Sequence, residues 1–185
     1  SAVENGKRVD TTMGLTPLAG IPMGSRSGDL DPSVVTYIMD KENISPKEME
    51  TILNKKSGLL GMSCISADNR DIEKAISEGN ENAKLAIAHY TYKIAGYIAN
   101  MATAMNGADV IVFTAGVGEN DITMREVICH NLGNLGIKLD PLKNKVRGKE
   151  TIISTDDSKV KILLIPTNEE LMIARDTYNI VTGRA

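Results

Sequence analysis

An apolar strand pattern that runs into glycines and then into a helix pattern constrains the fold of this chain most strongly. A strand is predicted at 109–113, followed by the glycine-containing segment 114–120 and a helix over 121–131. Gly116 and Gly118 have no Cβ, so the backbone can turn sharply there and a ligand can approach it closely. The N-terminal N–H groups and positive dipole end of the following helix would suit an anion such as a nucleotide phosphate. The pattern therefore predicts a phosphate-binding turn, with an ordinary strand-to-helix turn as the alternative.

The turn matches neither standard nucleotide fingerprint. Asn120 and Asp121 stand where the third glycine of G-x-G-x-x-G would be, and the chain has no G-K-[ST] phosphate loop. The pattern alone therefore leaves both alternatives open.

Strand and helix patterns alternate along the rest of the chain. Proline at the first helical position and capping residues mark two helix starts, at Asp31 and at Ser45, and Gly58 is expected to end the second of these helices. The alternation indicates an α/β fold with a mixed central sheet flanked by helices. Helices are predicted for 31–41, 45–56, 68–76, 80–106 and 167–181, and further strands for 151–153 and 160–165.

The chain is expected to begin inside a β-hairpin. Asn5-Gly6 between extended residues is a strong hairpin signal, yet the first arm has only four residues and no initiator Met. We therefore expect a piece of a larger protein, with a short ordered native N-terminus as the alternative.

The helix predicted over 80–106 would be about 40 Å long, at about 1.5 Å per residue. Its second half is apolar on nearly all sides, so it must be covered either by its own domain or by another subunit.

Composition excludes several classes of protein. With 42% hydrophobic and 24% charged residues, the chain is globular, and its net charge of −3 argues against a general nucleic-acid binder. Cys64 and Cys129 are expected to be reduced core thiols, and no spacing with His89 or His130 suggests zinc. No apolar run reaches the roughly 18 residues of a membrane span, so no membrane partner is expected.

Three polar clusters could carry chemistry. Arg26 lies in a glycine-rich loop, where its guanidinium could bind a phosphoryl or carboxylate group, or could pair with Asp29. Glu169 and Glu170 follow a strand, where they could ligate a metal or stabilise the first turn of the next helix. In the cluster 68–70, capping by the first residue is the default interpretation.

Five stretches together resemble the acetate and propionate kinase family. They are Asp10–Gly20, Met23–Pro32, Asn54–Gly58, Phe113–Asn120 and Pro166–Leu171, and they occur in the family's order across almost the whole chain. The resemblance implies the ribonuclease-H-like, actin-type ATPase fold that this family shares with sugar kinases, actin and heat-shock chaperones. It also implies a cytoplasmic homodimer that transfers a phosphoryl group from ATP to acetate or another short-chain carboxylate, with Mg²⁺.

The resemblance assigns roles to individual residues. Arg26 matches the catalytic arginine, Glu169 matches the glutamate associated with magnesium, and Pro17 matches a wall of the pocket for the acetate methyl group. An aromatic residue is common in the family where this chain has Asn69. The residues expected to bind ATP or ADP are Asp68, Asn69, Arg70, Gly116, Val117, Gly118 and Asn120.

The family's N-terminal half, with its first phosphate loop, second arginine, catalytic aspartate and histidines, is absent from this sequence. The resemblance thus implies that residues 1–185 are the C-terminal nucleotide-binding and dimerisation domain of a two-domain kinase, inactive alone. Two alternatives remain open: a propionate or butyrate kinase, and a non-catalytic nucleotide-binding or dimerisation module.

Overall fold

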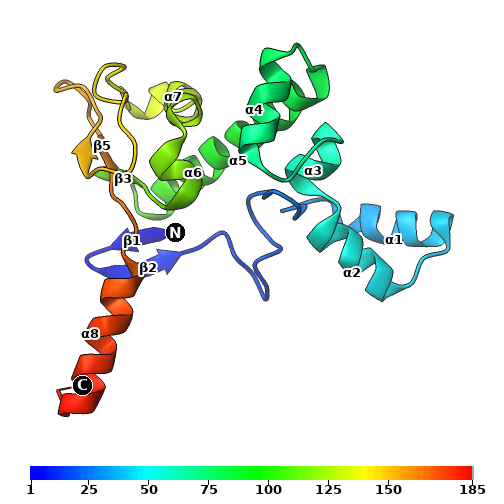
Figure 1. The fold of residues 1–185 in the computed structure, drawn as a ribbon, viewed down its shortest axis with the longest axis horizontal. Coiled ribbons are helices and arrows are strands. Elements are labelled where there is room, and N and C mark those ends of the chain that lie inside the picture. Colours follow the sequence, from blue (N-terminus) through cyan, green and yellow to red (C-terminus); the bar gives the residue numbers. More distant parts are fainter. Residues whose placement is uncertain (185) are drawn as a thin grey trace. The chain divides into compact units, whose positions relative to one another are not determined.

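The computed structural model describes residues 1–184 (Figure 1). Contacts divide the chain into two compact units, one from Ser1 to Gly107 and one from Ala108 onward, and each is described by itself.

The first unit consists of an N-terminal hairpin followed by five helices. The hairpin is confirmed: its strands pair antiparallel, and Asn5 and Gly6 have φ values of 50° and 76°, the left-handed conformation of a type I′ turn. The elements are β1 (Ala2–Glu4), β2 (Lys7–Asp10), α1 (Pro32–Glu42), α2 (Pro46–Lys55), α3 (Gly58–Ser63), α4 (Asn69–Ser77) and α5 (Glu81–Ala104).

The predicted helix starts are confirmed by their caps. Asp31 accepts a hydrogen bond from the Ser33 N–H, and Ser45 and Glu48 form a reciprocal capping box. The prediction for Gly58 is wrong, because α2 ends at Lys55 and Gly58 is the first residue of α3.

Helix α5 is the central element of the first unit. It packs against α3, α4 and both strands of the hairpin, as Figure 1 shows for α3 and α4. Ile72 and Ala75 of α4 form a buried cluster with Ala83 of α5. On other sides of α5, Leu85 and Tyr92 remain 63% and 69% exposed.

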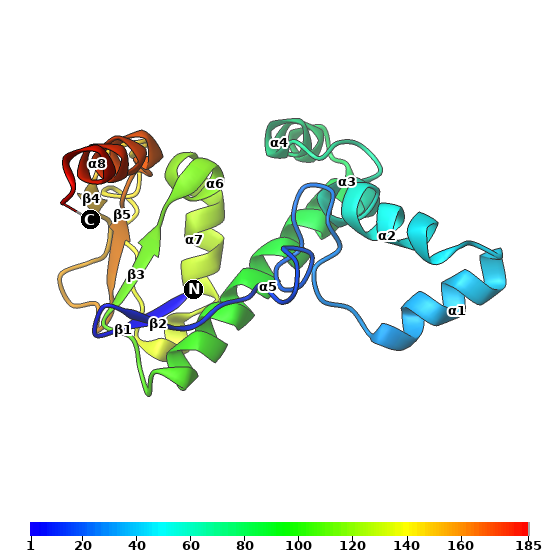
Figure 2. The ribbon, with the colours of Figure 1, turned by 90° about the horizontal axis from the view of Figure 1, so that it is seen from below.

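The second unit is built on a three-stranded mixed sheet. The strand order is β3-β5-β4, with β3 parallel and β4 antiparallel to β5, so the predicted α/β class is confirmed (Figure 2). The elements are β3 (Val110–Phe113), α6 (Ala115–Asn120), α7 (Ile122–His130), the 3₁₀ turn η1 (Gly133–Leu135), β4 (Thr151–Ile152), β5 (Lys161–Leu164) and α8 (Glu169–Thr182).

One face of the parallel strand pair forms the core of this unit. Phe113 pairs in register with Leu164, and both are buried, whereas Val110 and Val112 on the other face of β3 are 41% and 47% exposed. Parallel strands are normally covered on both faces.

Buried Arg125 of α7 fixes an irregular segment, residues 141–150. Its Nε donates to Asn144 Oδ1 at 2.8 Å, and its Nη2 donates to the carbonyls of Asn144 and Val146 at 3.0 and 2.8 Å. Its Nη1 donates to the Gly118 carbonyl in α6 at 2.8 Å. The side chain of Arg125 therefore connects α6 and α7 to a segment that forms neither helix nor strand.

Within the described part of the chain, no helix has both the length and the apolar character needed to cross a bilayer.

Candidate functional site

A cavity of about 540 Å³ opens at the carboxyl ends of β3 and β5 in the second unit. It is lined by Ala115, Gly116, Glu119, Thr167, Asn168, Glu169 and Glu170. The carboxyl ends of adjacent parallel strands are where α/β proteins bind ligands. The structure thus brings the glycine segment together with Glu169, as expected if both serve one site.

A set of hydrogen bonds clasps the two strand ends together. The hydroxyls of Thr114 and Thr167 are 2.8 Å apart, and the Ala115 N–H donates to Thr167 Oγ1 at 3.1 Å. The Thr167 N–H in turn donates to Glu119 Oε1 at 2.8 Å, and this bond lowers the pKa of the Glu119 carboxyl. The clasp holds the start of α6 beside the segment that leads into α8.

The glycine segment differs from the predicted turn. Gly116 and Gly118 lie within α6, and the residue with positive φ is Ala115, at 58°. An alanine in this conformation is strained, and the clasp through its N–H compensates for that strain. The helix predicted at 121–131 is confirmed as α7. The Asp121 carboxylate caps it by accepting from the Met124 N–H at 2.8 Å.

The two glycines have different surroundings. A Cβ at Gly118 would lie 3.3 Å from the Phe113 backbone, so this glycine allows α6 to pack on the end of β3. A Cβ at Gly116 would have no atom of the described residues within 4 Å, apart from its own helix and neighbours. Gly116 is therefore open on its cavity side.

Glu169 and Glu170 form the first turn of α8. Asn168 caps that helix by accepting from the Leu171 N–H at 3.1 Å, and both glutamates are exposed. Residues 1–184 hold no cluster of three or more acidic, His or Cys side chains able to bind a metal by themselves. The two exposed glutamates fit Mg²⁺, which commonly uses one or two carboxylates together with water and substrate phosphates.

Arg26 lies half-buried in its loop, in the first unit. Its Nη1 is 3.5 Å from Met23 Sδ, a weak contact. The alternative pairing with Asp29 is wrong: Asp29 accepts from the Gly20 N–H at 2.8 Å and from the Tyr97 hydroxyl. Among residues 1–184, no ion pair neutralises Arg26, so its charge is available to a ligand.

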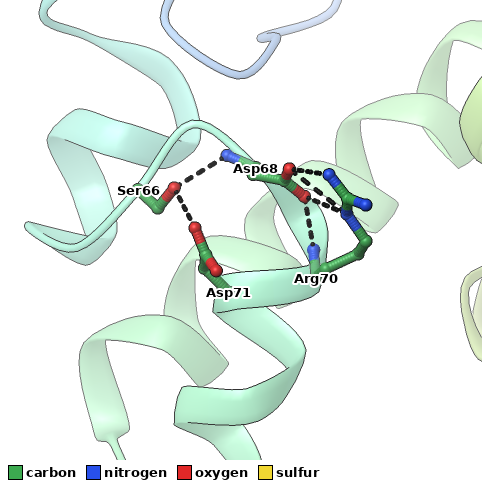
Figure 3. Close-up of polar contacts among 4 residues, drawn as sticks. All are labelled: Ser66, Asp68, Arg70 and Asp71. Carbon is green, nitrogen blue, oxygen red and sulfur yellow. Dashed lines mark hydrogen bonds and ion pairs between the residues drawn. The ribbon is translucent and has the colours of Figure 1, made fainter.

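Asp68 caps α4 and also holds Arg70, as Figure 3 shows. The Arg70 side chain donates from Nη2 to Asp68 Oδ2 at 2.6 Å and from Nε at 3.1 and 3.2 Å, and Arg70 lowers the pKa of Asp68 to about 2. The Arg70 side chain is 87% exposed. Ser66 supports the turn by accepting from the Asp68 N–H and donating to Asp71 (Figure 3). The result is a guanidinium fixed in one orientation with its surface open.

The remaining predicted site residues are distributed as follows. Pro17 is exposed in an irregular segment of the first unit, and Asn69 opens α4. Val117 is 38% exposed on α6, and the Asn120 side chain donates to the Gly116 carbonyl at 2.9 Å. Their predicted roles stay predictions.

Sequence reasoning missed Thr114, Glu119 and Thr167 as parts of the site. Thr114 directly follows β3 and Thr167 lies shortly after β5, which was the available signal, whereas Glu119 lies in α6 and had none. Hydroxyl and carboxylate groups at that edge are near enough to bond one another.

The two cysteines are both free, as expected, but only one lies in the core. Burial raises the pKa of the Cys129 thiol to about 12. Cys64 is exposed at the C-terminal cap of α3, so its assignment to the core is wrong.

Comparison with known proteins places this arrangement in a family. The family model described as the Acetokinase family matches residues 1–175. The chain belongs to the acetokinase family. It is 60% identical to the acetate kinase of Thermotoga maritima over 184 residues, and 57% identical to that of Lachnoclostridium phytofermentans over 181 residues. In each case the match covers 98% of this chain and 46% of the relative, so the chain spans about half the length of these acetokinases.

Solved structures of the acetokinase family agree with this fold. The Porphyromonas gingivalis acetate kinase matches with a TM-score of 0.93 and 48% identity, over 97% of this chain and 45% of that one. A propionate kinase from Francisella tularensis matches with a TM-score of 0.87 and 44% identity, over 94% and 44%. The resemblance seen in the sequence is therefore confirmed.

Proposed function

We propose that this chain is the C-terminal half of an acetate kinase, which transfers a phosphoryl group reversibly between ATP and acetate. The main support is the cavity at the ends of β3 and β5, where Gly116 and Glu169 line one space. Membership of the acetokinase family supports the reaction class. In this proposal the fold is the actin-type ATPase fold and the enzyme acts in the cytoplasm.

Each unit carries residues to which the family resemblance assigns nucleotide contacts. In the second unit, the open side of Gly116 leaves room for phosphates, and Val117, Gly118 and Asn120 would complete the binding segment. In the first unit, Asp68, Asn69 and Arg70 would contact adenosine. Asp68 fixes Arg70, and a planar guanidinium held in this way can stack on a base.

Charge neutralisation is the main task in phosphoryl transfer, because the transferred group carries spread negative charge. Arg26 has no carboxylate partner within residues 1–184, so its planar fork can bind that group. Glu169 would hold Mg²⁺, which supplies further positive charge to the phosphates. Pro17 would form part of the wall around the methyl group of acetate.

Removing the arginine tests the catalytic assignment. In the full-length enzyme, Arg26→Ala should lower kcat by roughly 10³-fold or more, while the nucleotide KM changes little, because the contact is strongest in the transition state. Arg26→Lys should rescue poorly, since a point charge cannot reproduce the fork. An Arg26→Ala enzyme with wild-type kcat and reduced thermal stability would show that the loop is purely structural.

The magnesium assignment has a separate readout. Glu169→Ala should raise the Mg²⁺ concentration needed for half-maximal rate, together with a loss of rate. Glu170→Ala, one residue further along α8, is the matched control. Equal behaviour of the two variants would contradict a specific role for Glu169.

A homodimer is the proposed assembly. Leu85 and Tyr92 on α5 are exposed, and α8 exposes Ile180 and Val181 by 71% and 79%. Light scattering at micromolar concentration should return twice the mass of the chain. A clean monomer over a tenfold concentration range would contradict the proposal.

The two alternatives can be separated by assay. The match to a solved propionate kinase structure keeps propionate or butyrate kinase as a second candidate. A turnover assay in which acetate, propionate and butyrate compete would distinguish it from acetate kinase. A non-catalytic module would bind nucleotide but show no turnover even with the full-length protein.

A further inference from the structure

The loop that carries Arg26 is held by main-chain hydrogen bonds from the start of α3. We define the arginine loop as residues 23–27. The Leu59 N–H donates to the Met23 carbonyl at 3.0 Å, and the Leu60 N–H donates to the Gly24 carbonyl at 2.8 Å. The Ser57 N–H donates to the Ser25 carbonyl at 3.0 Å. Three consecutive carbonyls of the arginine loop therefore receive bonds from one short stretch.

These bonds also complete helix α3. The first N–H groups of any helix lack partners within it, and no side chain among the described residues caps α3. The arginine loop supplies the acceptors instead, so loop and helix start satisfy each other. A second attachment runs from the Ser27 N–H to the Leu53 carbonyl, at 2.9 Å.

Gly58 makes this close approach possible. Its φ is 62°, and an added Cβ would lie 2.0 Å from the Met23 carbonyl oxygen and 2.7 Å from that of Arg26. Both neighbours are backbone atoms, which cannot move aside without displacing the loop. Any side chain at this position must therefore shift Arg26 or break its supports.

The arginine loop also approaches the segment that leads to the predicted adenosine residues. A Cβ on Gly24 would lie 2.6 Å from the Ala67 carbonyl oxygen, so the arginine loop also packs against the residue that precedes Asp68.

We propose that Gly58 is a positioning residue for Arg26, and that residues 57–60 set the place of the guanidinium relative to the transferred phosphoryl group. The proposal rests on the proposed function of Arg26. The Arg26 side chain itself has only the weak contact to Met23 Sδ, so its position depends on the backbone beneath it. A catalytic group moved by about 1 Å can cost on the order of 10²-fold in rate.

The test compares Gly58→Ala with Gly79→Ala in the full-length kinase. Gly79 has a φ of 87° and no atom of the described residues within 4 Å of an added Cβ, so its substitution causes similar backbone strain without a clash. Gly58→Ala should lower kcat by roughly 10²-fold with the nucleotide KM nearly unchanged. Gly79→Ala should keep kcat within about twofold, since strain of this kind affects stability and not the loop.

Ser25→Ala provides a milder second variant if Gly58→Ala fails to fold. It removes only the bond from Ser25 Oγ to the Asn54 carbonyl, 3.0 Å long, and should lower kcat several-fold without a change in nucleotide KM. Hydrogen exchange on the chain itself gives a readout without turnover. The amides of Leu59 and Leu60 should exchange faster in Gly58→Ala than in Gly79→Ala.

The outcomes separate this proposal from the proposed function. If Arg26→Ala abolishes turnover while Gly58→Ala and Ser25→Ala match Gly79→Ala, the positioning role is wrong and the proposed function stands. If Arg26→Ala leaves turnover intact, the catalytic role of Arg26 is wrong and the positioning role with it.

Discussion

Replacing the buried Arg125 with methionine should destabilise the second unit strongly. The side chain of Arg125 is 1% exposed, and its guanidinium makes four hydrogen bonds, two of them to buried oxygens of Asn144. Methionine fills a similar volume but donates nothing, so these acceptors lose the bonds that they receive from Arg125. The segment 141–150 would then lose its main attachment to α7.

The magnitude follows from the number of stranded acceptors. The Asn144 carbonyl keeps its bond from the Val146 N–H, so the acceptors that lose their donor are Asn144 Oδ1 and the partly buried carbonyls of Gly118 and Val146. At about 1–3 kcal/mol for a buried acceptor, and less for a partly buried one, the three together cost about 2–6 kcal/mol. The folded state no longer has to desolvate a charge, which offsets part of this loss. We expect a net loss of about 3 kcal/mol, which for a chain of this size lowers Tm by about 6–12 °C.

Urea unfolding followed by far-UV circular dichroism measures the loss. Arg175→Met is the matched control, because Arg175 lies exposed on α8, and it should change stability by less than about 0.5 kcal/mol. A double-mutant cycle with Asn144→Ala should show a coupling of about 1 kcal/mol or more. If Arg125→Met matched the control, the hydrogen bonds would not stabilise this segment and the reasoning would be refuted.

Three further outcomes follow from the site and its surroundings. Gly116→Val should weaken ADP binding to this chain, measured by titration calorimetry, with little loss of Tm, because only a ligand would meet the new side chain. A large loss of Tm with unchanged ADP affinity would contradict this expectation. Asp68 should titrate near pH 2 by carbon NMR and return toward 3.8 in Arg70→Ala. Because the folded-state pKa is lowered, the stabilisation from this pair is present above pH 3.8 and lost as the pH falls through 2, and an unshifted titration would exclude the pair. A thiol reagent at pH 8 should modify Cys64 quickly and Cys129 only after unfolding, whereas two fast thiols would contradict the burial of Cys129.

Elements with local signals could be predicted from the sequence. The Asn5-Gly6 turn and the Ser45–Glu48 capping box each depend on residues that are neighbours in the chain, so the pattern contains the whole cause. Gly116 and Glu169 each follow a predicted strand, but only the parallel pairing of β3 and β5 in the structure shows that they line one cavity.

Features set by distant residues could not be predicted in the same way. Gly58 begins a helix whose next two N–H groups donate to the carbonyls of Met23 and Gly24, which lie more than thirty positions earlier in the sequence. Ala115 adopts positive φ where its N–H donates to the hydroxyl of Thr167, which follows β5 about fifty positions later in the chain. No sequence pattern indicated that Arg125 is buried, and its hydrogen bonds to Gly118, Asn144 and Val146 explain its burial.

The position of Cys64 makes the chain suitable for optical reporting. This exposed thiol follows α3, the helix that supports the arginine loop, and precedes the turn that leads to Asp68. Since the other thiol is buried, a fluorophore can be attached at Cys64 without mutating the chain. Its emission would then show whether adding nucleotide alters the surroundings of the C-terminal end of α3.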